Sequence, residues 1–170
     1  RQMCIRDRQS IFQKTEYGYE TTISLPAWNA FFGKELELDV SIDEETVTNA
    51  HLHTVAFLQE NQEAILNLLL STLLEQYAEL QELYGYEPEE MQQIMPDVTD
   101  IQAFRNLLSP HSICIMNEQK DGLCCIGVEA ECTWDEEHDV GFMTYATQRC
   151  TIGAGDHAFN EYEAEALLEL

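Results

Sequence analysis

The stretch KELELDVSID (34–43) determines the kind of fold that we expect for this chain. Apolar and polar side chains alternate along it without a break: Leu36, Leu38, Val40 and Ile42 fall on one face, and Glu35, Glu37, Asp39 and Ser41 fall on the other. A period of two is typical of a β-strand whose one face is buried and whose other face meets water. We therefore predict a sheet that packs its core on one side.

The segments on either side of this stretch contain a second strand and a helical pair. YGYETTISL (17–25) also alternates, and PAWNAFFG (26–33) is predicted to be a turn whose aromatic side chains fill the core. From Thr46 to Tyr84 the apolar spacing becomes helical, and the polar run QENQE (59–63) divides it into two helices. We expect Asn61 to cap the second helix and Gly85 to end it.

The second half of the chain is predicted to be a β-meander. A short helix at EEMQQIM (89–95) and another at DIQAFRNLL (100–108), which ends before Pro110, come first. Strands follow at about residues 112–117, 123–134, 140–146 and 149–153. The sequence thus predicts one α+β domain over residues 9–170, with two layers: an antiparallel sheet of about six strands and helices packed on one face.

The first eight residues, RQMCIRDR, do not match the rest of the chain. They hold three of its eight Lys and Arg residues, and they resemble a translated sequencing adapter joined to a genuine reading frame. We therefore interpret residues 1–8 as a non-native segment and exclude them from the fold prediction. On this interpretation the natural N-terminus lies outside the sequence, together with any signal peptide. The alternative is a genuine basic N-terminal arm.

The charge of the chain limits the classes of partner that it can bind. The formal net charge is −24, and leaving out residues 1–8, which hold three arginines and one aspartate, changes it to −26. Such a field repels nucleic acids and anionic membranes and attracts basic proteins. We therefore predict no nucleic-acid partner and no membrane partner. The longest apolar run, AILNLLLSTLL (64–74), is also too short to span a bilayer. A solvated, highly soluble surface is the simpler explanation of the charge.

The cysteines indicate a reducing compartment. Without Cys4 there are five, an odd number with no C-x-x-C spacing, which argues against a disulfide framework and favours a cytoplasmic protein. Cys124 and Cys132 share a strand face with Val128 and Trp134, so we expect small buried hydrophobic residues rather than zinc ligands.

The segment CTWDEEHDVGF (132–142) is the strongest candidate for chemistry. It places His138 among carboxylates, which are the components of a metal site or of an oriented general base. Glu137, His138, Asp156 and His157 would be the metal ligands if the last hairpin folds back. Charged turns between strands are also ordinary hairpin chemistry, and we favour that interpretation, with no catalytic residue and no cofactor.

The chain resembles a family of uncharacterised bacterial domains with a Cys-x-Trp-x-Glu-Glu-His-Gly motif and a later Gly-x-x-Asp motif. The segments that carry the resemblance are ECTWDEEHDVGF (131–142) and IGAGDHAF (152–159), within a match over about residues 16–160. The shared positions are Trp134, Glu136, Glu137, His138, Gly153 and Asp156. Asp139 stands where the family usually has Gly, which puts a tight turn there in doubt.

The resemblance implies a loose association with toxin-immunity proteins and implies no enzymatic activity. We therefore expect a cytoplasmic, non-enzymatic interaction domain whose acidic surface binds a basic protein partner, with an immunity protein as one form of this function. A metal-binding module or metal-assisted hydrolase that uses Glu137, His138, Asp156 and His157 is the alternative.

Overall fold

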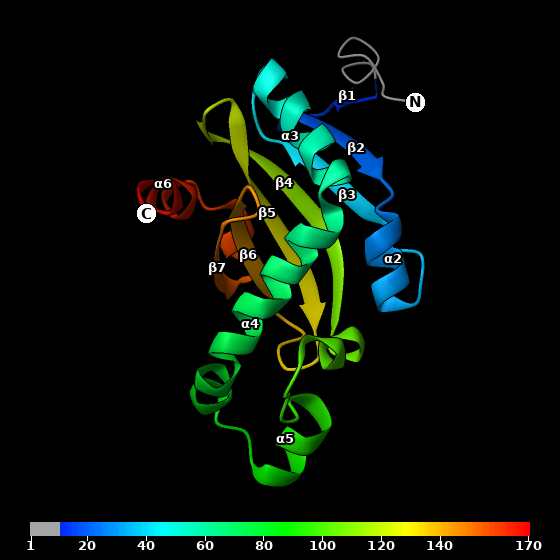
Figure 1. The fold of residues 1–170 in the computed structure, drawn as a ribbon, viewed down its shortest axis with the longest axis vertical. Coiled ribbons are helices and arrows are strands. Elements are labelled where there is room, and N and C mark those ends of the chain that lie inside the picture. Colours follow the sequence, from blue (N-terminus) through cyan, green and yellow to red (C-terminus); the bar gives the residue numbers. More distant parts are fainter. Residues whose placement is uncertain (1–10) are drawn as a thin grey trace.

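A computed structural model describes residues 11–170, so the proposed non-native segment at residues 1–8 lies outside the described residues. Seven strands form one sheet in chain order (Figure 1). They are β1 (Gln13–Lys14), β2 (Tyr19–Ile23), β3 (Leu38–Ile42), β4 (Leu108–Lys120), β5 (Leu123–Cys132), β6 (Val140–Tyr145) and β7 (Arg149–Ala154). The predicted α+β class is confirmed.

Two details of the sheet differ from the prediction. The strand count is seven because the two-residue β1 pairs with β2, and the sheet is mixed because β3 and β4 run parallel. All other neighbouring strands are antiparallel. The long helical connection between β3 and β4 is what permits a parallel pair, since parallel neighbours need a crossover.

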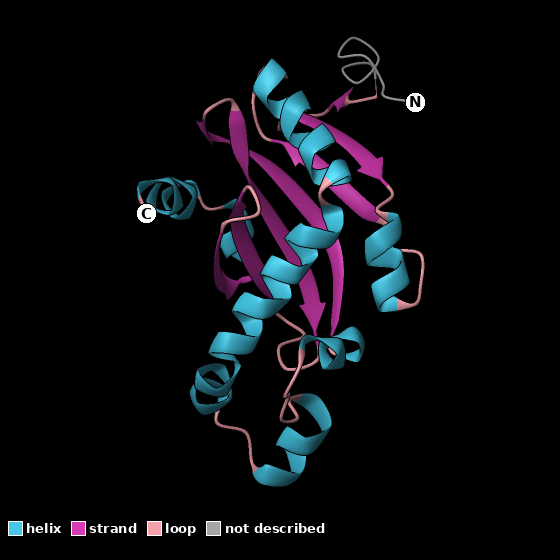
Figure 2. Cartoon of the chain, viewed as in Figure 1, coloured by secondary structure: helices cyan, strands magenta, loops and turns pink. Residues whose placement is uncertain are grey.

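The two long helices cover one face of the sheet, as Figure 2 shows. α3 (Asn49–Glu60) packs on β4 and β5, and α4 (Gln62–Tyr84) crosses the sheet to β7 and continues beyond its lower end to α5 (Pro88–Ile94). The main core lies between these layers and includes the predicted inward face of β3. Asn61 stands between the helices as predicted, but its side chain donates to the Phe57 carbonyl of α3 and makes no cap for α4.

The predicted turn at residues 26–33 is wrong, because these residues form the helix α2 (Pro26–Phe32). Pro26 begins the helix, where its missing N–H costs nothing, and Gly33 ends it in the left-handed conformation at φ 67°. The aromatic side chains do fill the core: Trp28 is fully buried and its Nε1 donates to the Gln62 carbonyl at 2.7 Å.

The predicted helix at residues 100–108 is also largely wrong. Only a short 3-10 helix, η1 (Ile101–Asn106), forms there, and β4 begins at Leu108 and runs through Pro110. The pairing of β4 with β5 shifts between Pro110 and Ser112. A β-bulge is a position where proline is tolerated within a sheet, because the extra residue leaves the ladder of hydrogen bonds.

The C-terminal segment covers part of the opposite face, which differs from the prediction of helices on one face only. The 3-10 helix η2 (Gly155–Phe159) lies on β5 and β6, and α6 (Glu161–Glu169) packs on β4, β6 and β7. Ala164 and Leu167 of α6 form a second buried cluster with Cys125, Met143 and Tyr145. The sheet therefore carries its main helical layer on one face and a smaller C-terminal cover on the other.

Cys124 and Cys132 are buried, as the strand pattern predicted. All five cysteines within the described chain are free thiols, and Cys124 and Cys132 belong to the main core while Cys125 faces the second cluster. Burial raises the pKa of Cys125 to about 12, so this thiol stays protonated at neutral pH. Across residues 11–170 no helix combines the length and the apolar character that crossing a membrane requires.

Candidate functional site

The turn between β5 and β6 joins the sheet to the end of α4. Trp134 is 2% exposed, and its ring packs edge-on against Tyr77 with centroids 5.8 Å apart. Tyr86 donates its hydroxyl to the Trp134 carbonyl, and Thr133 donates to the Ile94 carbonyl at 2.6 Å. These contacts bind α4, α5 and the turn into one unit.

Hydrogen bonds among three side chains fix the shape of the same turn. Tyr84 donates its hydroxyl to Asp135 Oδ2 at 2.7 Å, and Asp135 Oδ1 lies 2.9 Å from His138 Nδ1. Burial tends to raise the pKa of Asp135, but the hydrogen bonds from Tyr84 and His138 outweigh it and lower that pKa. The hydrogen bond to Asp135 raises the pKa of His138, whose side chain is 66% exposed. His138 is therefore held as a surface ion pair within the turn.

Asp139 resolves the doubt about a tight turn. It adopts the left-handed conformation at φ 60°, which glycine adopts without strain and which Asp tolerates better than most residues. Its N–H donates to the Asp135 carbonyl at 3.1 Å. The tight turn therefore forms without glycine, and it gains a carboxylate that glycine would lack.

The second segment that was predicted to supply metal ligands, around Gly153–His157, makes its contacts within the protein. His157 is buried, and its Nε2 lies 2.9 Å from Thr151 Oγ1. A Cβ on Gly153 would come within 2.7 Å of His157 Nδ1, so this position needs glycine for the imidazole to pack there. Burial lowers the pKa of His157, and its other nitrogen lies 3.9 Å from Glu163. Asp156 is exposed.

The predicted metal ligands do not come together as a set. Within the described chain, the group of three possible ligands whose atoms all lie within 4.8 Å of one another is His111, Glu129 and Asp139. Glu137, His138, Asp156 and His157 form no such group among residues 11–170, so the alternative of a hydrolase built on them has no geometric support.

Sequence reasoning missed His111 and Glu129 for a physical reason. Glu129 lies within β5, and an isolated glutamate on a strand carries no signal of its own. His111 lies at the shift in pairing between Pro110 and Ser112, and the position of a β-bulge is not visible in a single sequence. The proline directly before His111, in a strand that is otherwise central, is the one available hint.

A groove of about 810 Å³ runs beside this group. Lys34 and Arg105 line it together with His111, and Glu131, Glu136, Glu137 and Asp139 also contribute. It is a polar, mixed-charge groove, and it places the exposed Glu136 and Glu137 of the family motif at its margin.

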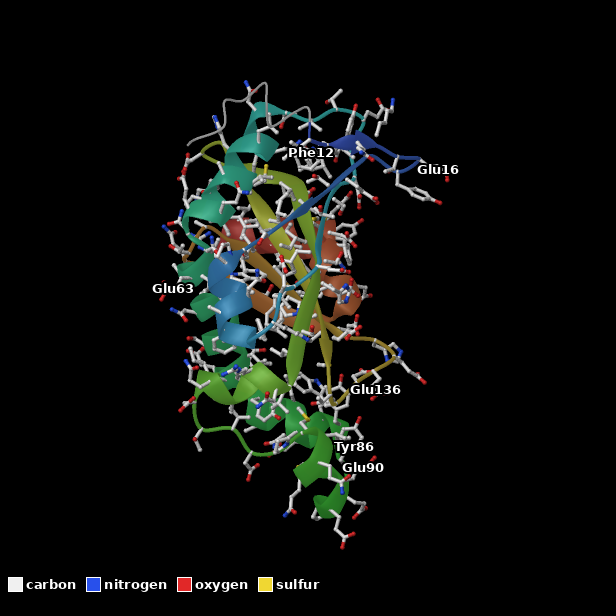
Figure 3. The ribbon with its side chains drawn as sticks, turned by 90° about the vertical axis from the view of Figure 1, so that its right-hand side faces the viewer. Phe12, Glu16, Glu63, Tyr86, Glu90 and Glu136 are labelled. Atoms are coloured by element: carbon white, nitrogen blue, oxygen red, sulfur yellow. The ribbon has the colours of Figure 1, made fainter. Side chains whose placement is uncertain are left out.

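Negative charge is largely unneutralised over the molecule. Between Lys34 and Arg105 the sequence contains no Lys or Arg. The ion pairs found among the described residues join carboxylates to His111, His138 and His157. The exposed carboxylates of Glu87, Glu89, Glu90, Glu136 and Glu137 lie at one end of the molecule, which we call the acidic end. Figure 3 shows Glu90 and Glu136 there on either side of Tyr86.

The chain was compared with curated proteins, with solved structures and with protein families. No curated protein and no solved structure matches the chain. A family described as a domain of unknown function, DUF6985, matches residues 11–159, which span β1 to η2 and include the β5–β6 turn and the groove beside it. The chain therefore belongs to the DUF6985 family.

Proposed function

We propose that this protein is an interaction domain of the bacterial cytoplasm whose acidic end binds a basic protein. The observation that carries the proposal is the uncompensated charge: no Lys or Arg occurs from residue 35 to residue 104, the segment that supplies α4 and α5. Like charges held close together repel one another, and a cationic partner relieves that repulsion. An immunity protein that covers a basic toxin would be one form of this function.

The fold holds the acidic end rigid while leaving its carboxylates free. Tyr84 and Tyr86 donate hydrogen bonds to the turn, whose Trp134 is buried. Thr133 of the turn donates to the Ile94 carbonyl of α5. Glu89, Glu90 and Glu136 point into solvent from that frame. A preorganised charged surface loses little side-chain and backbone entropy on binding, and it steers an oppositely charged partner during approach.

The test uses two variants with equal charge. One changes Glu89, Glu90, Glu136 and Glu137 to Gln at the acidic end. The matched control changes four exposed glutamates elsewhere, Glu16, Glu20, Glu63 and Glu169, to Gln. Figure 3 shows Glu16 and Glu63 far from the acidic end. Proteins captured from a bacterial lysate by the unaltered chain are purified, and their binding to all three forms is measured at 50 and 300 mM salt.

We expect a basic partner whose association rate falls at least about tenfold between the two salt concentrations, as electrostatic steering requires. The acidic-end variant should bind more weakly than the control variant. Equal loss in both variants would show that only net charge matters, and binding that is insensitive to salt would remove the electrostatic basis of the proposal.

A further inference from the structure

His111 and Glu129 come from two neighbouring strands, Asp139 comes from the turn before the next strand, and the three side chains converge on one point. His111 lies in the bulge of β4, Glu129 lies on β5 opposite Ser112 of β4, and Asp139 directly precedes β6. His111 Nε2 is 2.9 Å from Asp139 Oδ2, and all three possible ligand atoms lie within 4.8 Å of one another. The group is partly buried, with 39% of the His111 side chain and 18% of the Asp139 side chain exposed.

Three features of the backbone allow these side chains to meet. The bulge at His111 turns its side chain out of the regular alternation of β4, and the left-handed conformation of Asp139 turns its carboxylate back toward the sheet. Gly155 closes the other side: a Cβ there would lie 2.6 Å from Glu129 Oε1 and 3.3 Å from Asp139 Cβ. The Gly155 N–H donates to the His138 carbonyl at 2.9 Å, which holds η2 against the turn.

The group holds more acidic than basic side chains, with two carboxylates and one imidazole. No Lys or Arg forms an ion pair with any member of the group in the part of the chain that the structure describes. Two carboxylates and one imidazole facing a shared point are a familiar ligand set for divalent metals.

We propose that His111, Glu129 and Asp139 bind one divalent transition-metal ion, of which Zn²⁺ and Mn²⁺ suit the mixed nitrogen and oxygen ligands. The imidazole favours these ions over Mg²⁺ and Ca²⁺, which prefer oxygen ligands alone. Three protein ligands leave coordination positions open, and the group borders the groove that His111 and Asp139 line. The three ligands are not among the carboxylates of the acidic end, although Glu136 and Glu137 of that end line the same groove. Neither proposal depends on the other.

Calorimetric titration of the whole chain tests the site. The protein is first treated with a chelator and dialysed. Zn²⁺ or Mn²⁺ is then the titrant, and Mg²⁺ and Ca²⁺ are titrated as references. The variants are His111→Gln, Glu129→Gln and Asp139→Asn. Asn tolerates the left-handed conformation, so Asp139→Asn removes a ligand and keeps the turn. The matched control is His53→Gln, which removes an exposed histidine of α3 that takes no part in the group or in the turn.

We expect one Zn²⁺ per chain, bound at least tenfold more weakly by each of the three variants and equally well by His53→Gln, since loss of even an outer-shell partner costs about 10- to 100-fold in affinity. Circular dichroism verifies that each variant is folded. Absence of stoichiometric binding would overturn the proposal. An equal loss in His53→Gln, or unchanged affinity in Asp139→Asn, would also overturn it by showing diffuse binding to an acidic surface.

Discussion

Replacing Trp134 by Ala tests whether the family motif serves first to hold the fold together. Trp134 is 2% exposed and belongs to the main core. Truncating a buried tryptophan to alanine costs about 3–5 kcal/mol through lost transfer free energy and the cavity left behind. About 0.5–1.5 kcal/mol of that is expected from the edge-on contact with Tyr77. Because domains of this size lose roughly 2–4 °C per kcal/mol, the melting temperature should fall by about 6–20 °C.

Urea unfolding followed by far-ultraviolet circular dichroism measures this effect without depending on tryptophan fluorescence. Trp134→Phe should recover part of the loss because it keeps an aromatic ring against Tyr77. Glu136→Gln and Glu137→Gln are the controls: both side chains are exposed, and each change should alter the free energy of unfolding by less than about 0.5 kcal/mol. A loss below 1 kcal/mol in Trp134→Ala would refute the structural role.

Two further predictions concern the opposite face and the start of α3. Gly127→Ala would place a Cβ 1.6 Å from the Ala158 carbonyl oxygen, so η2 must move. We expect the free energy of unfolding to fall by about 1–3 kcal/mol and hydrogen exchange at residues 155–159 to become faster. An unchanged exchange rate would contradict the packing of η2 on β5. Burial lowers the pKa of His51, whose Nδ1 accepts from the Thr48 N–H at 3.0 Å. The unfolded chain therefore takes up this proton more readily, and the stability that the neutral imidazole contributes is present above a pH of about 6.5 and is lost below it. His51→Gln keeps an acceptor for the Thr48 N–H and does not titrate. The free energy of unfolding of the unaltered chain, relative to that of this variant, should therefore fall by up to about 1.4 kcal/mol between pH 7.5 and 5.5. Parallel pH profiles of the two proteins would disprove this role of His51.

The parts of the fold that have a strong period were predictable from sequence. Leu36–Ile42 alternates over a whole strand, and the two long helices carry enough turns for their spacing to be unmistakable. α2 was missed because seven residues are too few for a helical period, and only Pro26 and Gly33 signal its ends. The parallel pairing of β3 with β4 was missed because strand partners depend on how the helical connection packs, which is a tertiary property.

The site was predictable only in part. The resemblance identified the turn at Trp134–His138, and the strand pattern predicted a strand at about residues 123–134. Neither source indicates that Asp135 is bound by Tyr84, 51 residues away, or that His111 comes beside Asp139. Those contacts arise from a bulge, from a left-handed residue and from the end of a long helix, and each is decided by the assembled sheet.

The most direct test of the proposed docking function is hydrogen exchange of the chain alone and in complex with its purified partner. The account predicts new protection at residues 87–94 and 135–138, where α5 and the β5–β6 turn form the acidic end. Protection confined to β1 and β2 or to α6, with none at the acidic end, would contradict it.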